Sequence, residues 1–173
     1  MPKYIITGPP GAGKTSLLKG LQQCGYNGYA EASRNLIIEE KEKGSDCLPW
    51  INLPCFAKKA LQRMTNDFLM ATPDSFFDRG IPDIIAYLRA AQLPVDEEYR
   101  KAIRTYRYAT IVFLLPPWQQ IYVQDSERWQ TFEEAIILDE HIRAAYDNAG
   151  YHIVELPRST IQDRIRFIQT QLP

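Results

Sequence analysis

The chain has 173 residues, with 20 lysines and arginines against 21 aspartates and glutamates, and 45% of its residues are hydrophobic. This length suits one compact domain with a sizeable core. A formal net charge of -1 argues against a general nucleic-acid binder, because many phosphate contacts require an excess of basic residues. We therefore expect a globular protein without general nucleic-acid binding, and this charge balance is compatible with one local basic pocket.

Membrane and secretory segments are not expected. The apolar run at residues 3–7 is too short for a signal peptide, and the longest apolar stretch, residues 109–115, is far below membrane-spanning length. Cys24, Cys47 and Cys55 form no CxxC pair, and their odd number argues against a disulfide framework. We expect three reduced thiols, no membrane association and a cytoplasmic location.

The hydrophobic pattern alternates between strand-like and helix-like periods along the chain. The first half predicts a strand at 3–7, a helix at 15–24, a weak strand at 26–30, a helix at 31–43, a loop at 44–54, an amphipathic helix at 55–71 and a strand at 75–78. The second half predicts helices at 82–92 and 96–107, a strand at 108–115, a polar segment at 116–131, a helix ending near 148–150, a strand at 151–156 and a helix at 159–171. Strands separated by helices imply crossovers, so we predict a three-layer α/β fold with a five-stranded parallel sheet.

Residues 8–15 match the pattern GxxxxGK[ST] at every required position, between a predicted strand and a predicted helix. Glycines let the backbone wrap so that N–H groups converge on a phosphate, and the start of the next helix adds its dipole. Lys14 is predicted to bridge the β- and γ-phosphates, and Thr15 to ligate Mg²⁺. The residues predicted to bind the nucleotide are Gly8, Pro9, Pro10, Gly11, Ala12, Gly13, Lys14, Thr15 and Ser16.

Charged residues follow two further predicted strands. Asp78 ends the strand at 75–78, a position that faces the ligand crevice of an open parallel sheet, so it is predicted to hold Mg²⁺ or to accept a proton. A helix N-cap is the alternative role for Asp78. Glu31 and Arg34 follow the second strand, near the place where an acceptor hydroxyl would arrive. Glu31 could instead stabilise the dipole of its helix.

Three further segments have a functional and a structural interpretation. Arg128, in the polar segment, would bring charge to the transition state if 116–131 closes as a lid; a solvated loop is the alternative. Residues 156–160 follow the last strand, where an adenine could lodge, and Ser159 could instead cap the final helix. The aromatic residues of the region 44–107 could stack on an acceptor ring or fill the core; they include Trp50, Phe56 and Tyr87.

The segments 8–15, 31–34, 77–83 and 125–128 together resemble a family of small bacterial AAA-type P-loop ATPases and kinases, grouped with nicotinamide-riboside kinases. The resemblance covers nearly the whole chain. It implies an adenylate-kinase-like P-loop fold, ATP with Mg²⁺ and a small-molecule acceptor. Similar carboxylates serve nucleoside kinases as base and metal partner, which implies these roles for Glu31 and Asp78. Asp78 is the first residue of the sequence Asp-Arg-Gly, which differs from the Glu-Arg-Ser that deoxynucleoside kinases have at this position.

We predict an ATP- and Mg²⁺-dependent kinase that transfers the γ-phosphate to a hydroxyl of a nucleoside-like or other small metabolite and releases ADP. The alternative is a P-loop ATPase that acts as a nucleotide-dependent switch with a protein partner. We expect one P-loop domain over 1–173, with a helical acceptor-side region at 44–107 and a lid at 116–131. The predicted catalytic residues are Lys14, Glu31, Asp78 and Arg128, and the predicted acceptor-binding residues are Glu31, Arg34, Asp78 and Arg79.

Overall fold

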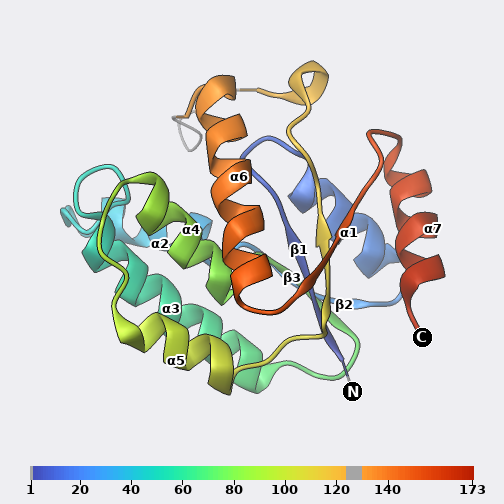
Figure 1. Cartoon of the computed structure of the whole chain (residues 1–173), viewed down its shortest axis with the longest axis horizontal. Coiled ribbons are helices and arrows are strands. Elements are labelled where there is room, and N and C mark those ends of the chain that lie inside the picture. Colours follow the sequence, from blue (N-terminus) through green and yellow to red (C-terminus); the bar gives the residue numbers. More distant parts are fainter. Residues whose placement is uncertain (1, 124–129) are drawn as a thin grey trace.

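The computed structural model describes residues 2–123 and 130–173 and contains a five-stranded parallel sheet in the order β2-β3-β1-β4-β5 (Figure 1). The strands are β1 (Lys3–Thr7), β2 (Asn27–Tyr29), β3 (Ser75–Asp78), β4 (Ile111–Leu114) and β5 (His152–Glu155). The helices are α1 (Lys14–Gln23), α2 (Ala32–Glu42), α3 (Leu53–Met70), α4 (Ile81–Ala90), α5 (Glu97–Thr105), α6 (Phe132–Asn148) and α7 (Ile161–Gln171), with a 3-10 turn at Gln119–Ile121. The predicted α/β fold is confirmed, with element ends shifted by a few residues.

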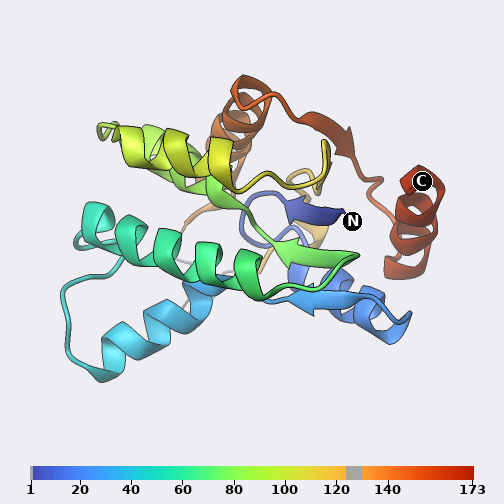
Figure 2. The same cartoon turned by 90° about the horizontal axis from the view of Figure 1, so that it is seen from below.

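Successive residues of each strand face opposite sides of the sheet, which divides the core into two hydrophobic clusters. Ile6 packs with α1 and α7, whereas its neighbour Ile5 packs with the cluster formed by helices α2 to α6. Phe76 and Phe77 divide in the same way. Figures 1 and 2 show α1 and α7 on one side of the sheet and the other helices on the opposite side. Both faces of the sheet are therefore covered, as parallel strands require.

The loop between β1 and α1 lies at the point where the strand order reverses. β1 pairs with β3 on one side, through Ile6 and Asp78, and with β4 on the other, through Thr7 and Leu114. In open parallel sheets the carboxyl ends of the strands beside such a reversal border the ligand crevice. The fold thus places the predicted phosphate-binding loop and the end of β3 at one crevice.

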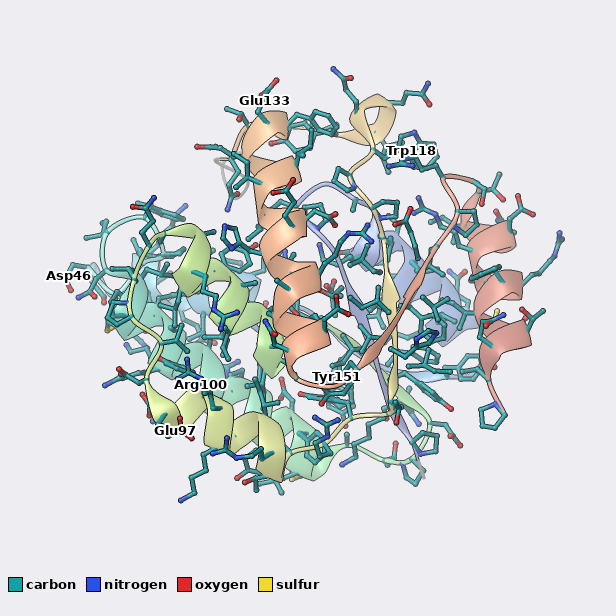
Figure 3. The ribbon with its side chains drawn as sticks, in the orientation of Figure 1. Asp46, Glu97, Arg100, Trp118, Glu133 and Tyr151 are labelled. Carbon is teal, nitrogen blue, oxygen red and sulfur yellow. A yellow bond between two sulfur atoms is a disulfide. The ribbon has the colours of Figure 1, made fainter. Side chains whose placement is uncertain are left out.

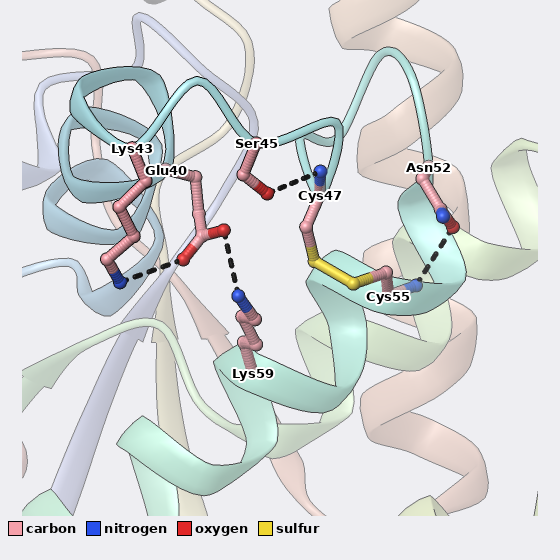
Figure 4. The surroundings of a disulfide bond; sticks show 7 residues. All are labelled: Glu40, Lys43, Ser45, Cys47, Asn52, Cys55 and Lys59. Atoms are coloured by element: carbon pink, nitrogen blue, oxygen red, sulfur yellow. Dashed lines mark hydrogen bonds and ion pairs between the residues drawn. A yellow bond between two sulfur atoms is a disulfide. The ribbon is translucent and has the colours of Figure 1, made fainter.

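Cys47 and Cys55 form a disulfide bond, so the expectation of three reduced thiols is wrong. Their Cα atoms lie 5.4 Å apart, because the loop after α2 folds back onto the first turn of α3 (Figure 4). Cys24 is free and exposed. Counting cysteines could not find this bond, because an odd total says nothing about which two thiols the fold brings together.

Reduction of this disulfide is expected to destabilise the fold by about 2–3 kcal/mol, because the bond removes the entropy of a short loop from the unfolded chain. In a chain of this size that corresponds to a melting temperature lower by about 5–10 °C. Thermal melts with and without dithiothreitol would measure the shift. The double variant Cys47→Ala, Cys55→Ala should melt at one temperature under both conditions; a wild-type melt that ignores the reductant would contradict the prediction.

No helix in the described ranges combines the length and the apolarity that crossing a bilayer requires.

Candidate functional site

The loop at residues 8–13 is shaped by glycines that other residues could not replace. Gly8, Gly11 and Gly13 have φ angles of 143°, 78° and 94°. A Cβ atom on Gly8 would lie 2.2 Å from the carbonyl oxygen of Leu115, which no side chain tolerates. Gly13 is the N-cap of α1 and has no side chain to satisfy the first N–H groups of the helix. Those donors are therefore available to an anion.

Lys14 is a buried cation at the mouth of this loop. Its side chain is 5% exposed, and its Nζ donates a hydrogen bond of 2.9 Å to the carbonyl oxygen of Pro9. Burial, assisted by the nearby positive charge of Arg79, lowers the pKa of Lys14 to about 8, although the carboxylates of Asp78 and Glu31 oppose the shift. An anionic ligand at the loop would favour the charged amine.

Asp78 at the end of β3 contacts the first turn of α1. The Thr15 hydroxyl donates to its Oδ2 over 3.3 Å, while its buried Oδ1 has no hydrogen-bond partner among the described residues. Burial, followed by the negative charge of Glu31, raises the pKa of Asp78 to about 6. The alternative that Asp78 caps the next helix is wrong, because α4 has Gly80 as its N-cap and Asp83 accepts the N–H of Gly80.

Thr15 and Asp78 have the chemistry of a site for a hard divalent cation. A hydroxyl and a carboxylate with one unpartnered oxygen are ligands that Mg²⁺ prefers. Among residues 2–123 and 130–173 there is no cluster of three or more acidic, histidine or cysteine side chains that could hold a metal alone. The two residues therefore suit an ion that takes its remaining ligands from phosphates and water.

Arg79 is a buried connector between the ends of β2 and β3 and the phosphate-binding loop. Its Nε donates to Oε1 of Glu31 over 2.9 Å, and its Nη1 donates to the Gly8 carbonyl and to Oδ1 of Asp83, both over 3.1 Å. Its φ of 77° is unusual for a residue with a side chain. The guanidinium, predicted from the sequence to bind the acceptor, is thus paired within the protein.

Glu31, the N-cap residue of α2, presents a partly exposed carboxylate to the crevice. Burial would raise the pKa of Glu31, but the positive charges of Arg79 and then Lys14 outweigh it and lower the pKa to about 2. Arg34 lies one helical turn later and lowers it further. The carboxylate is therefore ionised throughout the neutral pH range.

Sequence reasoning missed Asp83, the most extensively bonded carboxylate of the site. It is 1% exposed, and its Oδ1 accepts from the Thr7 hydroxyl over 2.7 Å and from Arg79. Its Oδ2 accepts from the Gly80 N–H over 3.0 Å and from the Tyr146 hydroxyl. An acidic residue three positions after an N-cap predicts a helix cap, but no local pattern reveals that β1, Arg79 and α6 all reach it.

A cavity of about 120 Å³ lies beside the phosphate-binding loop and opens between α2, α3 and α4. Its residues are Pro10, Gly11, Gly13, Lys14, Thr15, Ser16, Glu31, Ser33, Arg34, Ile37, Pro49, Leu53, Phe56, Ala57, Ala60, Met64, Arg79, Asp83, Ile84, Tyr87 and Gln130. Asp78 does not line it. Of the three aromatic candidates, Phe56 and Tyr87 line the cavity, whereas Trp50 lies outside it with Lys41 over its ring.

The structure describes only part of the segment 116–131 that the sequence predicts to be a lid. Arg128 lies outside the described residues, and Gln130 reaches the cavity from the end of the segment 116–131. Arg143 lies on α6, the helix that follows this segment, and pairs with Asp139 and Glu155 at 2.7 and 2.6 Å, so its charge is compensated within the protein.

Sequence reasoning also missed Arg164 of α7, which contacts the back of the phosphate-binding loop. Its Nη1 donates to the Ala12 carbonyl over 3.3 Å, and its guanidinium lies 5.0 Å from the ring of Trp118, which Figure 3 shows near the segment that enters α7. In the described chain, Arg164 Nη2 and Ser159 Oγ are buried without hydrogen-bond partners. The expected cap role of Ser159 is wrong, because Thr160 is the N-cap of α7.

Comparison with known proteins finds one matching family model, described as an AAA domain, over residues 3–164. No curated protein matches the chain. Among solved structures, deoxyadenosine kinase from M. mycoides with bound dATP has a TM-score of 0.71 at 15% identity, with 99% of this chain and 98% of that chain covered. Shikimate kinase from Acinetobacter baumannii has a TM-score of 0.65 at 18% identity, with 99% of this chain and 93% of that chain covered. Thymidylate kinase from Ehrlichia chaffeensis has a TM-score of 0.63 at 15% identity, with 99% of this chain and 100% of that chain covered. These likenesses establish a shared fold.

Proposed function

The chain belongs to the AAA domain family, and from that premise we propose that it is an ATP- and Mg²⁺-dependent kinase that phosphorylates a hydroxyl of a small metabolite. The observation that carries this proposal is the cavity, in which the phosphate-binding loop faces a carboxylate and an apolar wall. A site for a second substrate beside the γ-phosphate is what a kinase needs and a nucleotide switch does not. The similar solved structures are kinases of shikimate, deoxyadenosine and thymidylate, so the shared fold does not determine which compound is the acceptor.

The phosphates of ATP would lie in the loop that runs from Gly8 to Ser16, and Lys14 would neutralise them. Burial, with the charge of Arg79, lowers the pKa of Lys14, and a polyphosphate bound beside it would favour the charged amine. Arg164 Nη2 and Ser159 Oγ are both buried without hydrogen-bond partners in the described chain, and Arg164 also contacts the Ala12 carbonyl of the loop. They support a place for the adenine base near residues 156–160 and Trp118.

Thr15 and Asp78 would hold Mg²⁺. A bound Mg²⁺ would neutralise the negative charge on the β- and γ-phosphate oxygens. Asp78 is hydrogen-bonded to Thr15 and absent from the cavity lining, which favours a metal role over contact with the acceptor.

In the proposed transfer, the acceptor oxygen forms a bond to the γ-phosphorus while the bond to the β,γ-bridging oxygen breaks, and ADP leaves with that electron pair. The acceptor's proton passes to Glu31, which lines the cavity and which Arg79 keeps ionised and oriented. Arg34 would contact the acceptor or the transferring group from the next turn of α2. Arg128, outside the described residues, would add charge from the lid.

The region 44–107 would supply the acceptor side and the segment 116–131 the lid of a single domain. A cytoplasmic location is also part of the proposal, although a disulfide such as Cys47–Cys55 is unusual in that compartment.

Incubation of the protein with ATP, Mg²⁺ and a metabolite panel, followed by mass spectrometry, tests the kinase proposal. We expect one or more hydroxyl compounds to gain a phosphoryl group, with ADP formation that rises with the acceptor concentration. Heat-denatured protein serves as the control. Slow ADP formation that no acceptor changes, but that a protein partner alters, would contradict the kinase proposal and favour a nucleotide switch.

A further inference from the structure

We propose that the acceptor is an uncharged hydroxyl compound with a flat, largely apolar ring system, and that its phosphorylated or carboxylated counterparts are poor acceptors. The proposal rests on the kinase function proposed above and names the substrate class of the same site. It is carried by the charge balance of the cavity and by the composition of its far wall.

The cavity has no excess positive charge for an anionic acceptor once its phosphate end is set aside. Lys14 belongs to the loop that faces the phosphates of ATP. Among the described lining residues, the remaining charges are two cations, Arg34 and Arg79, and two anions, Glu31 and Asp83. Arg79 pairs with both anions. A second phosphate or a carboxylate would therefore enter a site of zero net charge and meet the partly exposed carboxylate of Glu31 there.

The far wall of the cavity is apolar. We call it the acceptor wall; it consists of Ile37, Phe56, Ala57, Ala60, Met64 and Ile84. All six side chains are buried, so nothing in the acceptor wall can satisfy a charged substituent. Two of them are alanines one turn apart on α3, which leave room for a ring to lie against the helix.

The cations of α3 are all directed away from the cavity. Lys59 pairs with the buried carboxylate of Glu40 at 2.8 Å, and Arg63 pairs with Glu39 at 2.9 Å. Lys58 lies 3.8 Å from Glu98. None of the three lines the cavity. Helix α3, which forms most of the acceptor wall, thus carries three cationic side chains but turns only apolar side chains toward the cavity.

The polar end of the cavity suits a hydroxyl group. Glu31 offers an ionised oxygen that can accept an O–H donor, and Tyr87 offers a phenol whose ring lies 5.3 Å from the guanidinium of Arg79. Burial raises the pKa of Tyr87, so its hydroxyl keeps the proton at neutral pH and can donate. A compound with a hydroxyl at one end and an uncharged ring at the other matches both ends of the cavity.

Matched pairs of compounds test this assignment, because each pair differs only in charge. The probes are nucleosides, pyridoxine and riboflavin, each paired with its 5′-monophosphate, together with shikimate as a carboxylate. Calorimetry with a non-hydrolysable ATP analogue measures binding, and mass spectrometry with ATP measures transfer. We expect at least one neutral member to have a kcat/KM at least about 100-fold above that of its monophosphate, because the added negative charge would be brought close to the carboxylate of Glu31.

Tighter binding of a monophosphate or of shikimate than of every neutral probe would overturn the assignment, and so would the absence of binding by all neutral probes. The binding measurement tests the acceptor class independently of the proposed kinase activity. A neutral compound that binds preferentially and is never phosphorylated leaves the acceptor class standing and contradicts the kinase.

Two substitutions on α3 form a matched test of the acceptor wall. Met64→Lys places a cation in the wall and is expected to weaken binding of the neutral compound about 10-fold, while Leu69→Lys, on an exposed position of the same helix, should leave it unchanged. If Met64→Lys fails to fold, Phe56→Leu provides the same information. Phe56→Leu should raise the KM for the acceptor and leave the KM for ATP unaltered; equal changes in both would contradict the wall's role.

Discussion

Replacing Lys14 with alanine is expected to lower ATP-dependent phosphorylation at least about 1,000-fold, because the variant loses a preorganised charge on the transferring phosphate. Arg79, the cation whose charge acts on Lys14, is already bound within the protein. The guanidinium of Arg79 is held by Glu31 and Asp83, and its Nη1 also binds the Gly8 carbonyl. Initial rates of product formation, measured by mass spectrometry at saturating ATP, would give the size of the loss.

The fold of the Lys14→Ala variant should persist, because the substitution removes a cation that burial already disfavours. Circular dichroism and a thermal melt would verify this. Lys19→Ala, on an exposed position of the same helix, is the matched control and should keep full activity. A Lys14→Ala enzyme that works within threefold of wild type would show that the phosphates bind elsewhere.

Asp83→Asn is expected to destabilise the protein by about 3–5 kcal/mol, since it removes one partner of a buried ion pair. Two donors point at each oxygen of the Asp83 carboxylate: the Thr7 hydroxyl and Arg79 at one, the Gly80 N–H and Tyr146 at the other. An amide replaces one of these oxygens with a donor, so two of the four hydrogen bonds cannot form. Urea unfolding monitored by fluorescence would measure the free energy of unfolding.

Asp163→Asn separates this loss from ordinary helix capping. Asp163 has the same position in α7 that Asp83 has in α4, three residues after the N-cap, but it is exposed. Its hydrogen bonds within the described residues go to Thr160 and Arg166. We expect its substitution to cost less than about 1 kcal/mol. Similar losses for both variants would contradict the role of Asp83 as a buried centre that joins β1, Arg79 and α6.

The fold followed from the sequence because its signals are local. Each strand and helix came from the period of its apolar residues, and the order of the elements implied crossovers and a parallel sheet. The phosphate-binding loop was equally readable, since Gly8, Gly11 and Gly13 occupy backbone conformations that other residues avoid. Local geometry that constrains residue type leaves a pattern in the sequence.

The disulfide and two buried charged residues left no such pattern. Cys47 and Cys55 meet because a loop returns to the helix after it. Asp83 is bonded from β1 and α6, and Arg164 reaches the carbonyl of Ala12 across 152 positions of sequence. Nothing near Asp83 or Arg164 in the chain distinguishes them from exposed residues at a helix start or in a helix.

The sequence by itself determined the α/β fold and the phosphate-binding loop, because apolar periodicity and glycine conformation are properties of consecutive residues. Only the tertiary structure decided how the charges are distributed. It pairs Arg79 with Glu31 and Asp83, places Lys14 in the lining of the cavity, and directs the cations of α3 away from that cavity. Electrostatic balance depends on distances between residues far apart in the chain, so the acceptor class could be inferred only once those distances were known.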